Sequence, residues 1–166
     1  STRRVLIRTR DVLAKEGGAL EKMLPPFQMG AGGPVGDGQQ GMSWVHIDDL
    51  VDLYIYAVEN EKLSGVYNGT APEPLTNKVF SKVLGKVLGK PVLFPVPPFV
   101  LKVALGEMSQ LVTQGQFVST KRTLKSEFEF QYPRLAGALS DILKDIKEGY
   151  SFIESYQWIP KKKSEV

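Results

Sequence analysis

Several features are absent or rare in this chain of 166 residues. It contains no cysteine and only one histidine, His46. Disulfides, thiolate metal ligands and His-rich metal sites are therefore excluded, and we predict no metal site. It also has no long apolar run: the most apolar segment, residues 91–106, is broken by four prolines and by Lys102. A membrane-spanning helix needs about 20 continuous apolar residues. We therefore expect no membrane span, while peripheral association with a membrane stays open.

The sequence also lacks an internal basic stripe. Its net charge of +3 and pI of about 9.0 come partly from the two ends, STRR and KKKSEV. Nucleic-acid binding that depends on phosphate contacts needs clustered Lys and Arg, so we expect no nucleic-acid partner. The hydrophobic content of 42% and charged content of 23% are typical of a globular protein.

Strand-like and helix-like segments alternate along the chain, which indicates an α/β fold, or α+β if the chain is an isolated half. Periodicity predicts strands at 4–8 (buried), 43–47, about four residues after Ser64, and 128–133. It predicts helices at 19–29, 48–59, 77–89 with Thr76 as N-cap, 99–114 in two pieces, and 134–147. Pro25 and Pro26 should kink or end the first helix. The positions expected to face inward are Leu20, Met23, Leu24 and Phe27; Leu50, Leu53, Tyr54 and Ala57; Val79, Phe80, Val83, Leu84 and Val87; and Leu135, Leu139, Ile142, Leu143 and Ile146.

A glycine-rich segment, GAGGPVGDG at residues 30–38, could suggest a phosphate-binding loop. A dinucleotide fingerprint, however, directly follows a strand and opens a helix, so that the helix N-terminus meets the pyrophosphate. Here the glycines follow a predicted helix and precede a predicted strand. We therefore interpret residues 30–41 as a mobile surface loop.

His46 is followed by two aspartates, Asp48 and Asp49, and this spacing allows two interpretations. A histidine with a carboxylate partner can act as a general base. Alternatively, both aspartates satisfy free backbone N–H groups in the first turn of the helix, and the His46 ring bonds to backbone at the junction of strand and helix. The structural interpretation is favoured, because no G-x-S-x-G, H-E-x-x-H or P-loop motif accompanies the histidine.

Several blocks, in order, resemble a known family. RVLIRTRDVL, GGALEKM, GGPVGDGQQ, SWVHIDD, VYNGTAPEP and PVPPFVLKVALGEM are similar to blocks of the atypical extended short-chain dehydrogenase/reductases. More narrowly, they resemble the "epimerase family" proteins of bacteria, chloroplasts and mitochondria. The resemblance covers about residues 3–144. It implies late strands of a Rossmann-like sheet plus a mostly helical substrate cap. It also places five residues near a substrate cleft: Arg8, Gln40, Ser43, Trp44 and His46.

The resemblance is to the C-terminal half of that family. The glycine fingerprint for NADP and the catalytic Tyr-x-x-x-Lys pair, which belong to its N-terminal half, do not occur in this sequence. We therefore expect no catalytic residue and no cofactor for this chain alone, and NADP if an N-terminal half is present. Arg10-Asp11 stands where the family has Gly-Val, and Gly41 where it usually has Trp.

We divide the chain into a dehydrogenase-like half, residues 1–147, and an extension, residues 148–166, which is rich in aromatic residues. Aromatic side chains often anchor interfaces, although packing back onto the chain is an equal alternative. The extension is interpreted as a possible partner-docking tail, and its candidate contact residues are Tyr150, Phe152, Tyr156 and Trp158.

Two functions remain open. The chain is either the substrate-side half of an NADP-dependent epimerase or oxidoreductase, or a catalytically inactive assembly subunit of a larger organellar complex. A free-standing small-molecule binder ranks third. Because the strand at residues 4–8 would be an exposed apolar edge without neighbours, we expect a protein partner. The resemblance suggests the chloroplast stroma before the mitochondrial matrix, or the cytoplasm of a bacterium.

Overall fold

The computed structural model describes residues 2–97, 99–100, 102, 106 and 115–146. It confirms the α/β fold class. Within these residues, six strands form three two-stranded ladders. Two ladders are parallel: β1 (Val5–Thr9) with β5 (Gly65–Gly69), and β2 (Asp11–Leu13) with β4 (Trp44–His46). The third, β3 (Gly41–Met42) with β6 (Leu75–Thr76), is antiparallel. The helices are α1 (Gly18–Gln28), α2 (Ile47–Glu59), α3 (Asn77–Leu88), α6 (Lys121–Lys125) and α7 (Leu135–Ile142).

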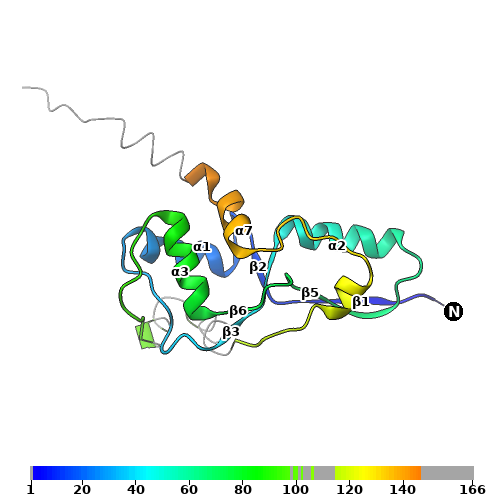
Figure 1. Cartoon of the computed structure of the whole chain (residues 1–166), viewed down its shortest axis with the longest axis horizontal. Helices are drawn as coiled ribbons and strands as arrows, with labels where there is room; N and C mark the ends of the chain where they lie inside the picture. Colours follow the sequence, from blue (N-terminus) through cyan, green and yellow to red (C-terminus); the bar gives the residue numbers. More distant parts are fainter. Residues whose placement is uncertain (1, 98, 101, 103–105, 107–114, 147–166) are drawn as a thin grey trace, which may run out of the picture.

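The described chain is elongated, with different helices at its two ends (Figure 1). At one end α1 and α3 lie together with α7, and their apolar faces form the main core with β2 and β4. At the other end α2 runs alongside β1 and β5 over a smaller cluster of Ala57, Leu63 and Tyr67. The buried residues of the main core are Leu13, Leu20, Met23, Leu24, Phe27, Met42, Trp44, Ala71, Phe80, Leu84, Leu135, Ala138, Leu139, Ile142 and Leu143.

Local sequence signals place the helices well. In α1 the four expected residues are buried, and the helix ends at Gln28, two residues beyond Pro26, rather than at the prolines. The Pro25 carbonyl still accepts a hydrogen bond from the Met29 N–H at 3.1 Å, so the last turn closes although the prolines donate nothing. Thr76 caps α3 as predicted, since its hydroxyl accepts from the Val79 N–H.

Some predicted inward positions are wrong. Tyr54 is 50% exposed and Val79 is 42% exposed, because each lies at the edge of its apolar face. The strand β1 forms where predicted, but it is not buried: Leu6 is 49% exposed. Among the described residues β1 pairs with β5 alone, so its other hydrogen-bonding edge has no strand neighbour there.

The strand predicted at 128–133 does not form. The backbone N–H groups of Gln131 and Tyr132 donate to the Asp49 carboxylate, at 2.6 and 3.0 Å, rather than to a neighbouring strand. Phe128 is buried and packs edge-to-face on Phe130. The apolar alternation therefore reflects packing of a non-strand segment.

Part of the glycine-rich segment is buried, which contradicts its predicted position at the surface. Gly33, Val35 and Gly38 are buried, and Val35 forms an isolated parallel bridge with Val96. A Cβ atom at Gly33 would lie 2.0 Å from the Phe94 carbonyl oxygen. Glycine is therefore required here because another backbone segment approaches closely.

The predicted helices at 99–114 fall largely outside the described residues. The last predicted helix appears as α7, followed by a further helical turn at 144–146, with Leu135, Leu139, Ile142 and Leu143 buried. Within the described ranges, no helix combines the length and apolarity that crossing a membrane requires.

Candidate functional site

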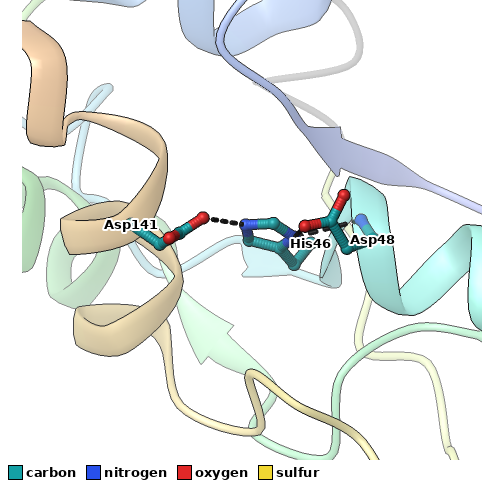
Figure 2. Close-up of side chains that lie close together, drawn as sticks. All are labelled: His46, Asp48 and Asp141. Atoms are coloured by element: carbon teal, nitrogen blue, oxygen red, sulfur yellow. Dashed lines mark hydrogen bonds and ion pairs between the residues drawn. The ribbon is translucent and has the colours of Figure 1, made fainter.

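His46 ends β4 and is the N-cap of α2. Its Nδ1 accepts a hydrogen bond from the Asp48 backbone N–H at 3.0 Å, and its Nε2 lies 3.2 Å from Asp141 Oδ2 on α7 (Figure 2). Because Nδ1 accepts, the neutral ring carries its hydrogen on Nε2 and donates it to Asp141. The predicted bond between the ring and the backbone is confirmed.

The ring is also enclosed. Tyr132 stacks on it with ring centroids 3.9 Å apart and planes 18° apart, and His46 is only 1% exposed. A general base needs a free nitrogen within reach of a substrate proton. Both ring nitrogens are engaged and the ring is covered, so the geometry favours a structural role for His46.

Asp49 does not cap its own helix, contrary to the sequence prediction. It is fully buried and accepts from the backbone N–H groups of Gln131 and Tyr132. Burial raises the pKa of Asp49, and the two hydrogen bonds and the nearby His46 offset this only in part. Asp49 lies one turn before Leu53 and thus on the buried face of α2. The helical spacing of the apolar residues could therefore have predicted its burial.

Asp141 is the other residue that the sequence analysis missed. Burial raises its pKa, but the hydrogen bond and charge of Lys144, together with the hydrogen bond to His46, outweigh this and hold the pKa below its usual value. Asp141 and Tyr132 are distant from His46 in sequence, so no local pattern could have identified them.

His46, Asp48 and Asp141 offer potential ligand atoms that all lie within 4.8 Å of one another. A cation there would have to displace the bond at one of the two nitrogens of His46. Asp48 is also 60% exposed at its side chain and 3.8 Å from Nδ1. The donor set is already used within the protein, and we assign no metal to it.

Of the other predicted cleft residues, Ser43, Trp44 and Gln40 are buried or partly buried, whereas Arg8 is exposed. Ser43 and Trp44 directly precede the His46 strand end and are buried: the Ser43 hydroxyl donates to the Gln116 carbonyl at 2.7 Å, and the Trp44 indole donates to the Glu73 carbonyl at 3.0 Å. Gln40 is partly buried, and its side-chain amide donates to the Val35 carbonyl at 3.3 Å. Arg8 lies apart, exposed on β1 opposite Asn68 of β5. Contact of any of them with a substrate stays a prediction.

Gly41 has a structural reason to be glycine. A Cβ atom there would lie 2.7 Å from the Gln116 carbonyl carbon and from the Phe117 nitrogen. The backbone of residues 115–117 thus occupies the space into which a side chain at position 41 would point. The tryptophan that the family usually has at this position could not fit without moving that segment.

Comparisons with known proteins agree with this fold. Residues 96–142 match the Domain of unknown function (DUF1731). The chain is 48% identical over 139 residues to the chloroplastic SDR39U1 homolog of Arabidopsis thaliana, covering 84% of this chain and 40% of that protein. It is 43% identical over 136 residues to the epimerase family protein YfhF of Bacillus subtilis, covering 82% and 45%. The crystal structure of human SDR39U1 (isoform 2) with NADPH superposes with a TM-score of 0.80 at 37% identity, over 87% of this chain and 49% of that one.

The α/β fold of this chain thus matches part of the fold of epimerase-type short-chain dehydrogenase/reductases. Within that class, the chain belongs to the epimerase family proteins and corresponds to their C-terminal half. It spans about half the length, 40–49%, of the curated relatives it matches.

Proposed function

We propose that this chain is the substrate-side half of an NADP-dependent epimerase or oxidoreductase and acts only when a nucleotide-binding half accompanies it. The solved human relative is described with NADPH. This chain contains neither a glycine fingerprint nor a Tyr-x-x-x-Lys pair. The cofactor and the proton-transfer pair would therefore come from the other half.

The observation that carries this proposal is the incomplete sheet at β1. Parallel sheets are normally covered on both faces, and their strands lie between neighbours. In the described residues β1 has one parallel neighbour, β5, and Leu6 on its outer face is 49% exposed. A further parallel strand from a nucleotide-binding half would pair with the free edge of β1 and remove an aggregation hazard.

The experiment is to co-express this chain with the part of YfhF that it does not cover, and to titrate NADPH by calorimetry. We expect NADPH to bind to the complex and not to this chain alone. Leu6→Lys should abolish assembly, whereas the matched control Leu124→Lys, at an equally exposed position on α6, should not. NADPH binding by the isolated chain, or none by the assembled pair, would contradict the proposal.

A second candidate function, an inactive assembly subunit, is favoured by the outer face of α2. Val51, Tyr54, Ile55 and Val58 are 48–73% exposed and form one continuous stripe at helical spacing. Exposed apolar stripes of this kind mark interaction sites. The inner face of α2 carries Leu50, Leu53 and Ala57, so the helix has two apolar sides.

This candidate predicts a stoichiometric partner that is lost in a Val58→Lys variant and retained in a Glu59→Lys variant, as followed by native mass spectrometry of the purified complex. The predicted docking residues of the 148–166 extension lie outside the described residues, and deletion of the extension tests them separately. If the partner is retained both by the Val58→Lys variant and by the chain that lacks residues 148–166, neither this face nor the extension is the docking site.

The compartment follows the source of the chain. Relatives include a chloroplastic plant protein and bacterial ones. We propose the chloroplast stroma for a plant source and the cytoplasm for a bacterial one, with the mitochondrial matrix as the alternative. Import of a tagged full-length precursor into isolated chloroplasts and mitochondria separates the two organelles.

A further inference from the structure

A pocket of about 200 Å³ lies where β2 meets α1 and α3. Most of its lining is apolar and belongs to the margin of the main core. An apolar cavity of about 150 Å³ is large enough to hold benzene, so this pocket can take one ring or a short branched chain. Its lining includes the apolar Leu13, Leu20, Met23, Met42 and Phe80, together with two charged residues, Arg10 and Asp11.

Asp11 is placed to face this pocket. Side chains two residues apart on a strand point to the same side, and Leu13, two residues on, is buried in the main core against α1 and α3. Burial raises the pKa of Asp11, against the opposing effects of the Arg10 charge and of a hydrogen bond from the Ser43 backbone. Within the described part of the chain, Asp11 has no ion-pair partner within 4 Å.

A partly buried carboxylate in an apolar wall is best compensated by a cation that brings its own donors. A carboxylate ligand would be repelled by Asp11, and a purely apolar ligand would desolvate it further without compensation. A primary ammonium group satisfies the carboxylate oxygens, while an attached apolar group fills the space beside Leu20 and Phe80. Arg10 also lines the pocket, at its exposed side, and its charge opposes the rise in the pKa of Asp11, but the two side chains form no ion pair within 4 Å, so the carboxylate keeps room for the ammonium group.

We propose that this pocket binds a primary amine carried on a compact apolar group, with the ammonium at Asp11 and the apolar group against Leu13, Leu20 and Phe80. The inference deepens the proposed function and rests on it in one respect: the bound amine would belong to the substrate of the completed enzyme. The binding itself requires no nucleotide.

The test is an NMR titration of the full ¹⁵N-labelled chain with three ligands of similar shape: 2-phenylethylamine, the neutral 2-phenylethanol, and the anionic 3-phenylpropionate. We expect the amine to bind at least tenfold more tightly than the alcohol, with shifts at the amides of Val12, Gly18 and Ala19. The anion should bind most weakly.

Two variants locate the effect. Asp11→Asn should reduce amine affinity to that of the alcohol, whereas Asp37→Asn, an exposed aspartate outside this pocket, should leave it unchanged. Ala19→Leu adds a larger side chain to the lining and keeps a good helix former; it should abolish binding of both amine and alcohol, which gives a test if the Asp11 variant does not fold.

Equal affinities for amine and alcohol, shifts confined to another surface, or no binding by the wild-type chain would each overturn the assignment. The NADPH experiment is independent of this titration. A positive amine titration with failed NADPH binding would remove the enzyme proposal and keep the pocket, and the reverse result would remove the pocket alone.

Discussion

At the scale of single residues, the hydrogen bonds around His46 join three segments that are far apart in the sequence. His46 contacts Tyr132 by stacking and Asp141 by a hydrogen bond, while Asp49, three residues later, holds the backbone at Gln131 and Tyr132. Buried polar networks of this kind stabilise one arrangement strongly when every member is satisfied. The signature around His46 therefore fixes where α7 and the 128–133 segment lie.

Asp49→Asn should destabilise the chain by about 1.5–3 kcal/mol, because the amide keeps one oxygen acceptor and turns an NH₂ group toward a backbone N–H that loses its partner. Asp52→Asn, one turn on along α2, should cost much less, since the hydrogen bond that Asp52 accepts among the described residues comes from the exposed Gln131 side chain. Urea unfolding at neutral pH measures both variants. Equal losses would show that the buried position of Asp49 does not matter.

The Asp141 carboxylate should make stability depend on pH. Its pKa in the folded chain lies below the ordinary value of about 3.9, so the folded state binds its proton less tightly than the unfolded state. Its contribution is fully present above that ordinary value and is lost as pH falls toward the lowered pKa. The stability difference between wild type and Asp141→Asn should therefore shrink between pH 5 and pH 3. A difference that stays constant across urea unfolding curves at pH 6, 4 and 3 would rule this out.

What the sequence could not predict at this scale is the partner of a polar residue that turns inward. The capping bond of His46 is local, within two residues, and was predicted correctly. Asp48 and Asp49 look equivalent as first-turn acids, yet one is exposed and the other fully buried. The spacing to Leu53 indicates that Asp49 is the one on the buried face. Its partners, residues 131–132, are more than 80 positions away, and the partner of a long-range hydrogen bond leaves no local pattern.

At the scale of elements, the glycine-rich segment packs closely against the backbone at Phe94. Gly33→Ala should destabilise by about 1–3 kcal/mol, because the new Cβ would meet the Phe94 carbonyl oxygen at 2.0 Å and force the two segments apart. Gly137→Ala in α7 is the matched control, since nothing lies within 4 Å of its Cβ position, and it should stabilise by about 0.5–1 kcal/mol through helix propensity. Thermal unfolding measures the stability of both variants. If Gly33→Ala is as stable as the wild type, the loop is free to move away from residues 94–96.

Helices were predicted better than strands, for a physical reason. The apolar spacing of Leu20, Met23, Leu24 and Phe27, and the cap at Thr76, are encoded within one or two turns. A strand exists only through its neighbour. The segment 128–133 has suitable residues, but its N–H groups are taken by Asp49; the 4–8 strand forms, but its expected burial needs a neighbour beyond β5.

At the scale of the whole molecule, the two ends of the chain differ in how much apolar surface they bury. The α1, α3 and α7 end encloses most of the large buried side chains, whereas the cluster at the β1 and β5 end has Ala57, Leu63 and Tyr67 as its buried members. Local opening is easiest where few apolar contacts are made. The end that carries the free β1 edge is therefore expected to be the less stable one.

Hydrogen exchange tests this gradient and its link to assembly. In the isolated chain, amides of β1 and β5 should exchange faster than those of α3 and α7, because opening the smaller cluster exposes less apolar surface. When the nucleotide-binding half is added, β1 should gain protection while α3 changes little, since only β1 acquires a new neighbour. The Leu6→Lys variant should lose this gain and keep the slow exchange of α3. Uniform exchange across both ends of the isolated chain would mean that the two clusters open together. Protection of the exposed stripe of α2, in place of β1, on addition of the other half would favour the assembly-subunit role over the enzyme half.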